Sequence, residues 1–231
     1  MSRNTREEVL RLIKTGLRGS SDTGQEEKKP IISPANNSEG IKQKIMETYK
    51  KIEVKKWGLI NRFVEELTKV GGKAIAAKGR REAIELIIKL VDNYKAKCLA
   101  IWESHLLLGL RELIMSKGLQ FASPNNKYEM IKADIGITEV DFAIAETGTI
   151  VLISNQRQPR SVSLIPPIHI AVMKSDVIVE NLDDLFFLLR NYSELTSCIT
   201  FVTGPSRTAD IELNLTLGVH GPKELLVIIY P

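Results

Sequence analysis

Cysteine is scarce in this chain: its 231 residues include two, Cys98 and Cys198. There is no CxxC pair and no group of Cys and His residues at metal-ligand spacing, so the chain offers nothing to hold an iron–sulfur cluster or a structural zinc ion by itself. Each cysteine lies in an apolar run, KCLAIW or SCITFV, and is expected to be a small buried side chain. We therefore expect no metal site and no cofactor in this chain.

Long hydrophobic runs are also missing. No segment reaches the roughly 20 apolar residues needed to span a membrane, and the opening residues MSRNTREEVL lack the apolar core of a signal peptide. These two absences predict a cytoplasmic protein without a membrane span.

Neither charge sign is in large excess, because 32 Lys and Arg residues face 28 Asp and Glu residues, which gives a net charge of +4. Six lysines gather between positions 42 and 56, but no aromatic side chains interleave usefully with them. This pattern is typical of a solvated helix surface and does not favour nucleic acid as a partner. Aromatic residues make up only 6%, so Ile, Leu and Val must fill most of the core.

The first 40 residues differ from the rest. Residues 1–18 have the apolar spacing of an amphipathic helix, and residues 19–40 are rich in small, polar and Pro residues, as linkers are. We therefore expect a variable N-terminal extension over 1–40, followed by a single domain over 41–231.

The pattern after Ile41 predicts an α/β fold. Helical spacing recurs over 41–67, 80–92, 104–117 and 182–189, and the runs KAIAA, KCLAIW, DFAIA, TIVLIS, RSVSL, IHIAVM, SCITFV and ELLVIIY indicate strands. Strands that alternate with helices indicate a mixed sheet flanked by helices, with the N-terminal helical extension before it.

The stretch AIAETGTIVLISN places one acid, Glu146, between two apolar runs. A strand that ends in Glu and turns at Gly148 presents the carboxylate at a sheet edge, where the hydroxyls of Thr147 and Thr149 are able to bond it or a ligand. Glu146 is thus a candidate nucleophile, general base or ligand-orienting acid. The alternative is a structural carboxylate satisfied by backbone N–H groups or by an arginine.

Two further segments break the local pattern. The loop NQRQPRS carries Arg157 and Arg160, which suit planar recognition of a carboxylate or phosphate; the alternative is a solvated loop. In LIPPIHI, His169 interrupts an apolar strand. It is a candidate ligand-binding residue, and the alternative is a hydrogen-bonded histidine of the core.

The segment TGPSRTADIE follows an apolar strand, as ligand-binding turns of α/β proteins do. Ser206 or Thr208 could cap a short helix whose N–H groups attract an anion. The later GVHGP turn adds His220, a second candidate catalytic residue. The alternative is capping plus an internal ion pair. The ligand-binding candidates of this segment are Gly204, Ser206, Arg207 and Asp210.

Taken in order, GITEVDFAIAETGTIVL, RSVSLIPPIHIAV and VTGPSRTADIELNLTLGVHGPKEL resemble the lactate utilization protein C family, whose members carry the LUD domain. The resemblance is dense from about residue 134 onward, and over 41–133 only the alternation of helices and strands agrees. It implies a fold similar to that of the sugar-phosphate isomerases and coenzyme A transferases. It also implies a cytoplasmic role in oxidising L-lactate to pyruvate, beside partner proteins that carry iron–sulfur clusters.

Three functions stay open at this point. The first is a non-redox component of the lactate system, which binds a carboxylate, another small anionic ligand or a partner at the strand ends. The second is an independent acyl or coenzyme A transferase, or an isomerase, in which Glu146 reacts as similarly placed glutamates of coenzyme A transferases do. The third is a ligand-sensing or scaffold protein that binds an acidic partner or nucleic acid through Lys42–Lys56. Whether the chain is an enzyme by itself, and whether it forms a homo-oligomer, the sequence leaves open.

Overall fold

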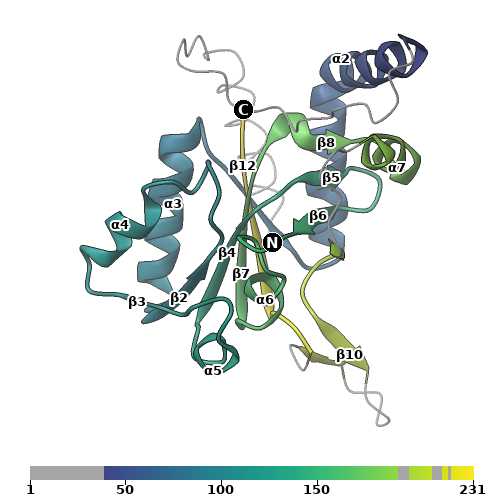
Figure 1. The fold of residues 1–231 in the computed structure, drawn as a ribbon. Helices are drawn as coiled ribbons and strands as arrows, with labels where there is room; N and C mark the ends of the chain where they lie inside the picture. Colours follow the sequence, from purple (N-terminus) through teal and green to yellow (C-terminus); the bar gives the residue numbers. More distant parts are fainter. Residues whose placement is uncertain (1–38, 192–197, 210–214, 218–219) are drawn as a thin grey trace.

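The computed structural model describes residues 39–191, 198–209, 215–217 and 220–231 (Figure 1). The helix predicted for 1–18, nearly all of the predicted linker, and Asp210 lie outside these residues. In the described part of the chain, no helix combines the length and apolar character that crossing a bilayer requires.

The first half of the described chain alternates helices with strands. Its elements are α2 (Glu39–Lys69), β1 (Lys73–Ala76), α3 (Arg80–Asn93), β2 (Cys98–Ile101), α4 (Leu110–Met115), β3 (Gln120–Phe121), α5 (Lys127–Met130) and β4 (Ile135–Glu139). The second half is dominated by strands. Its elements are β5 (Phe142–Ile144), β6 (Thr149–Ser154), α6 (Ser161–Leu164), β7 (Ile168–Lys174), the 3-10 helix η1 (Ser175–Val177), β8 (Ile178–Val179), α7 (Leu182–Arg190), β9 (Cys198–Val202), β10 (Arg207–Ala209), β11 (Leu215–Leu217) and β12 (Glu224–Tyr230).

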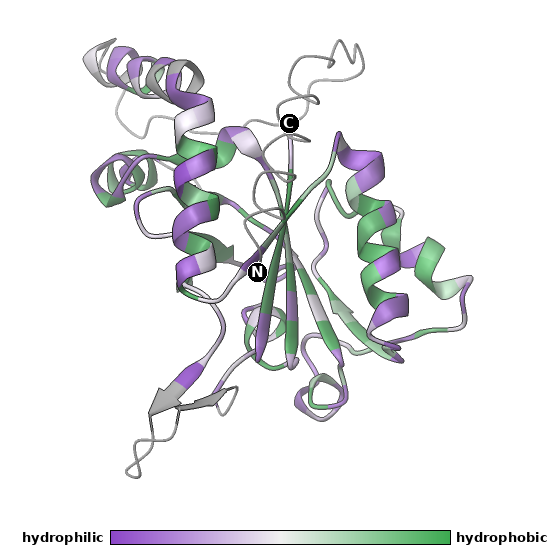
Figure 2. Ribbon diagram, turned by 180° about the vertical axis from the view of Figure 1, so that it is seen from behind, coloured by the Kyte–Doolittle hydropathy of each residue, from purple (hydrophilic) through white to green (hydrophobic). Residues whose placement is uncertain are grey.

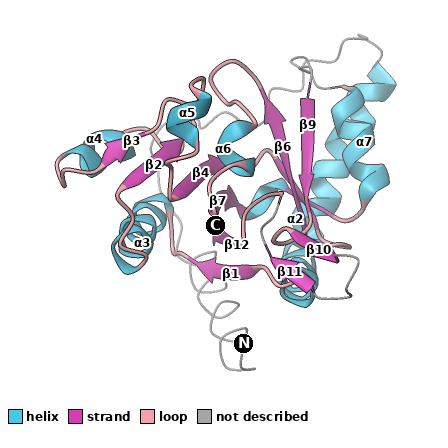
Figure 3. Ribbon diagram, turned by 90° about the horizontal axis from the view of Figure 1, so that it is seen from below, coloured by secondary structure: helices cyan, strands magenta, loops and turns pink. Residues whose placement is uncertain are grey.

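A six-stranded parallel sheet, here sheet A, forms the centre of the molecule. Its strand order is β1-β12-β7-β4-β2-β3. Figures 1 and 3 show α3 and α4 on one side of it, and α6, α2 and a second sheet on the other. Because both faces are covered, the central strands are nearly continuous apolar runs, coloured mostly green in Figure 2.

The second sheet, sheet B, has the strand order β8-β5-β6-β9, with antiparallel β5–β6 and β6–β9 pairs and a parallel β5–β8 pair. The chain passes from sheet A to sheet B at two neighbouring residues. The Val140 N–H donates to Val172 O of β7 at 2.9 Å, and the Asp141 N–H donates to Val151 O of β6 at 3.1 Å. The backbone hydrogen bonds therefore continue from one sheet into the other without a gap.

Helix α2 covers sheet B and contacts two of its turns through glycines. Gly148 has φ +64°, and a Cβ there would lie 2.2 Å from the backbone nitrogen of Leu67. Gly204 has φ +88°, and a Cβ there would lie 2.7 Å from the carbonyl oxygen of Val70. Both turns thus need glycine for backbone conformation and for space.

The predicted α/β fold is confirmed, and its mixed strand directions are confined to sheet B. One predicted strand is wrong: RSVSL contains the short helix α6. Helix α6 packs over Gly136 of β4, where a Cβ would collide with the Val162 carbonyl oxygen. The alternation of polar and apolar residues in RSVSL suits a short strand or a helical turn, and this packing contact selects the helix.

The short helix expected after Ser206 or Thr208 is also wrong. Residues Arg207–Ala209 form β10, which pairs with β11 in an antiparallel ribbon. The ribbon projects from the body (Figures 1 and 3).

The helix predicted over 104–117 is shorter than expected. Helix α4 covers only Leu110–Met115, because Arg80 holds the preceding segment as a turn. Its guanidinium donates to the carbonyl oxygens of His105, Leu106 and Leu108 at 3.0–3.1 Å.

The contact between Gly148 and α2 makes a testable prediction about stability. Gly148→Ala should lower the free energy of unfolding by more than Gly109→Ala. Gly109 has φ +82° with nothing within 4 Å of its Cβ position, so its substitution should cost only the roughly 1–2 kcal/mol of a left-handed alanine. The Gly148 variant must in addition displace α2. Urea titration of both variants measures the difference, and equal losses would show that α2 does not constrain the turn.

Candidate functional site

A chain of threonine hydroxyls joins the two turns that the sequence singled out. Thr147 Oγ1 lies 2.7 Å from Thr149 Oγ1, which lies 2.8 Å from Thr203 Oγ1. The link exists because β6 and β9 are neighbours, with Ile150 opposite Val202. The ETGT turn and the TGPSR turn are therefore adjacent, and their hydroxyls bond one another.

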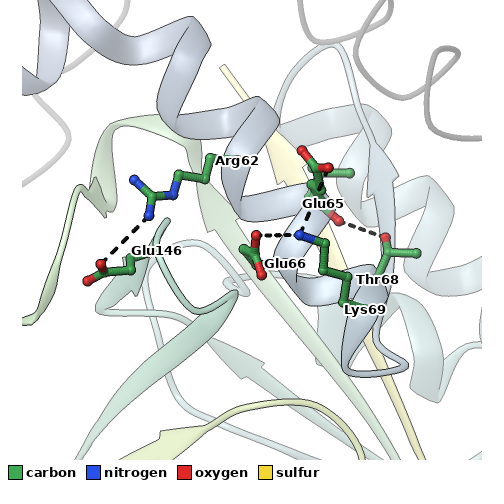
Figure 4. A network of polar contacts seen from close by, with 7 residues as sticks. Arg62, Glu65, Glu66, Thr68, Lys69 and Glu146 are labelled. Carbon is green, nitrogen blue, oxygen red and sulfur yellow. Dashed lines mark hydrogen bonds and ion pairs between the residues drawn. The ribbon is translucent and has the colours of Figure 1, made fainter.

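Glu146 lies at the surface of this junction. Its carboxylate is 3.7 Å from the guanidinium of Arg62 on α2, and both side chains are about half exposed, 50% and 48% (Figure 4). Figure 4 shows the next turns of α2 carrying a further network, in which Lys69 contacts Glu65 and Glu66. Exposed pairs of this kind contribute about 0–1 kcal/mol. The acid thus meets an arginine, as one alternative expected, and its reactivity stays a prediction.

The TGPSR turn packs against the end of α2 and against the later GVHGP turn. The Ser206 N–H donates to Pro222 O at 2.8 Å, and the exposed His220 precedes that contact by two residues. The guanidinium of Arg207 lies over Gly71, where a side chain would collide with it. Glu146 therefore meets α2 at Arg62, whereas Arg207 lies at the turn that follows the helix. Asp210, the remaining ligand-binding candidate of this segment, lies outside the described residues.

His169 is fully buried in β7. Its Nε2 lies 2.9 Å from Thr138 Oγ1 of β4, and its Nδ1 has no hydrogen-bond partner in the described structure. Burial lowers the pKa of the imidazole to about 3, so the ring is neutral near pH 7. This environment is that of a core histidine, and no part of the ring is open to a ligand.

A cavity of about 340 Å³ lies at the carboxyl end of β2. Sheet A has β3 on one side of β2 and β4 on the other, so the chain leaves β2 in one direction and later returns on its other side. Open α/β sheets bind ligands at such a switch point. The lining residues are Ile101, Glu103, Arg111, Pro124, Asn125, Gln156, Arg157 and Pro159.

Trp102 fixes the loop that brings Arg157 to this cavity. Its indole Nε1–H donates to Pro159 O at 3.0 Å, and its backbone N–H donates to Ile137 O at 3.0 Å. The next residue, Glu103, donates its N–H to Arg157 O at 3.4 Å. The loop after β6 of sheet B is thereby tied to the end of β2 in sheet A.

Two arginines and one acid set the charge of the cavity. Arg157 was predicted as a ligand-binding residue, whereas Arg111 and Glu103 were not. The polar residues directly after the apolar run KCLAIW were a signal for Glu103; nothing in the helical pattern distinguished Arg111 from a solvated residue. Arg160 stands at the N-cap of α6 and is not among the lining residues. With Arg111 and Arg157 against Glu103, the cavity is suited to an anion that also carries a hydrogen-bond donor.

The buried His169 predicts a pH effect on stability. Its pKa is lowered on folding, so the unfolded chain takes up the proton first and stability falls with pH from about 6.5 toward 3. In His169→Gln this contribution is absent, so the stability advantage of the wild type should shrink in that window, by at most about 1.4 kcal/mol per pH unit.

Urea titrations of both proteins between pH 7.5 and the acid limit of folding measure this difference. Asp141, whose pKa burial raises to about 7, titrates in both proteins and cancels. A difference that stays constant with pH would contradict the neutral buried state of His169.

The tie between Trp102 and Pro159 predicts a local loosening. Trp102→Phe keeps a buried ring but removes one of the two donors to Pro159 O, the other being the Val162 N–H at 3.2 Å. The loss of this hydrogen bond should cost about 0.5–1.5 kcal/mol. It should also speed hydrogen exchange of the Glu103 and Gln158 amides. Trp57→Phe on α2 is the matched control. Equal exchange in the two variants would show that the indole does not hold the loop.

Comparison with known proteins places this architecture in one family. The LUD domain matches residues 60–230. Lactate utilization protein C of Halalkalibacterium halodurans is 32% identical over 174 residues, covering 71% of this chain and 75% of that protein. Lactate utilization protein C of Bacillus subtilis is 32% identical over 184 residues, covering 77% and 71%.

A solved structure agrees with the fold. The crystal structure of a DUF162 family protein from Deinococcus radiodurans superposes with a TM-score of 0.57 at 23% identity, covering 76% of this chain and 98% of that one. The family match over residues 60–230 includes both sheets and the residues that line the cavity at β2. This chain belongs to the LUD domain family.

Proposed function

We propose that this protein takes part in lactate utilization, as a component of an L-lactate-oxidising system that carries no redox group of its own. Its membership of the LUD domain family and the names of its relatives support the role in lactate utilization. The two cysteines of the chain lie on different sheets, on β2 and β9, which supports a division of labour with iron–sulfur partner proteins.

The cavity at the end of β2 is the site where we expect a small anionic ligand to bind. Arg111 and Arg157 both line it, and arginine is the side chain best suited to grip a carboxylate in two places. Glu103, Asn125 and Gln156 line the same cavity and are able to accept a hydrogen bond from a hydroxyl. A small 2-hydroxy acid or its 2-oxo product matches this donor and acceptor set.

The alternative of an acyl or coenzyme A transferase has no observation in its favour. Such an enzyme would need Glu146 beside a space for the acyl group. Instead its carboxylate is half exposed and paired with Arg62, and Glu146 does not line the cavity at β2.

Titration calorimetry with L-lactate and with pyruvate tests the proposed site. Arg111→Ala and Arg157→Ala should each weaken binding by at least about tenfold, because a hydrogen bond to a charged group contributes about 1.5–3 kcal/mol. Arg81→Ala is the matched control, since this side chain is 95% exposed on α3. If neither cavity variant changes the affinity for L-lactate and pyruvate, or if the control weakens it equally, the cavity is not the binding site.

A further inference from the structure

A second cavity, of about 530 Å³, lies beside the first at the outer edge of sheet A. Its floor comes from β2 and β3, with Cys98, Phe121 and Ala122, and its walls come from the helices α4 and α5. Figures 1 and 3 place this edge away from α2 and sheet B, which lie across the central sheet. The groove is therefore separate from the turns that carry Glu146 and Arg207.

Exposed apolar side chains lie in this groove and close to it in the chain. Met115, which lines the groove, is 59% exposed. Tyr128 of α5 and Ile131, which follows this helix, are 81% and 64% exposed and are neighbours in sequence of the lining residues Glu129 and Lys132. Large apolar side chains gathered around a hollow mark an interaction site more often than scattered ones do.

The charges around the groove are basic on balance. Arg111 and Lys132 line it and Lys127 begins α5, and none of the three forms an ion pair with another described residue. Arg111 lies over the Phe121 ring, 5.0 Å from its centroid. The one acid of the lining, Glu129, already accepts from the Ser123 N–H and the Asn126 amide, both at 2.8 Å. The surface is complementary to an acidic partner.

The shape favours a helix over a strand as the occupant. The edge strand β3 has only two residues, Gln120 and Phe121, which is too short to extend the sheet with a partner strand. The groove instead runs between two helices over an apolar floor, where the apolar stripe of an amphipathic helix fits. We propose that the α4–β3–α5 groove is a docking site for an acidic amphipathic helix of a partner protein.

The docking site shares one residue with the anion cavity. Arg111 lines both, so a helix bound in the groove contacts the wall of the cavity at β2. The idea that the helix belongs to a partner protein in lactate oxidation rests on the proposed function. The idea that the groove binds a helix does not. Any effect of docking on anion affinity must be matched by an equal effect of the anion on docking.

A labelled helical peptide of about 18 residues, with leucines at i, i+4, i+7 and i+11 and glutamates beside them, is the probe. Fluorescence anisotropy should show saturable binding to the full chain. Met115→Glu and Lys132→Glu should each weaken it at least tenfold. Phe186→Glu on α7 is the control, because Phe186 is 52% exposed on a distant surface.

Three results would overturn the proposal: no binding of the acidic peptide, equal binding of a peptide with lysines in place of glutamates, or an equal loss in the Phe186 control. Titration of L-lactate with the Met115→Glu variant keeps the two proposals apart. The variant should keep its affinity for L-lactate while its affinity for the peptide falls. In the wild type, lactate binding without peptide binding rejects the groove alone, and peptide binding without lactate binding rejects the cavity alone.

Discussion

The hydrogen bond from the Trp102 indole to Pro159 O joins the end of β2 to a loop that comes from the other sheet. Trp102 follows the last strand residue of β2 in sheet A, and Pro159 closes the loop after β6 of sheet B. Trp102 is only 2% exposed, so an indole N–H left unpaired there would lose its partner with little water to replace it. Together with the bond from the Glu103 N–H to Arg157 O, this contact holds the loop that carries Arg157 at the end of β2, where Arg157 and Arg111 line the cavity.

Helix α2 plays the corresponding role on the other side of the molecule. Its apolar face covers sheet B, and its last turns press against Gly148 and Gly204. The two turns are thereby held next to each other, linked through Thr149 and Thr203. The solvent-exposed surface at these turns is polar and includes the ion pair between Glu146 and Arg62. The conspicuous motifs of the sequence thus have a clear structural role, whether or not they also bind a ligand.

Most of the fold could be predicted because its signals are local. Buried parallel strands such as ELLVIIY and IHIAVM are apolar throughout, and glycines and prolines mark their ends. The wrong predictions of secondary structure lie in segments whose conformation depends on tertiary contacts. RSVSL became a helix because Gly136 leaves room for it, and the segment before α4 became a turn because Arg80 binds its carbonyls. Neither contact leaves a mark in the local pattern.

The site was harder to predict than the fold. Arg157 was identified from its loop, but Arg111 is an exposed arginine of the short helix α4 beside Glu112, so residue type alone could not distinguish it from a solvated side chain. His169 was conspicuous because a polar residue interrupted an apolar strand, and that position is explained by its bond to Thr138. Sequence identifies unusual residues, whereas the tertiary structure brings them together: sheet order places β2 beside β3, and the hydrogen bonds of Trp102 and Glu103 bring the loop after β6 to the end of β2.

The central claim is that the end of β2 receives the carboxylate of a small organic acid between two arginines from different parts of the chain. A crystal structure of the protein grown with pyruvate tests this claim most directly. We expect the pyruvate carboxylate within hydrogen-bonding distance of the guanidinium groups of both Arg111 and Arg157. Pyruvate seated instead beside Glu146 or Arg207, with the cavity at β2 filled only by water, would contradict it.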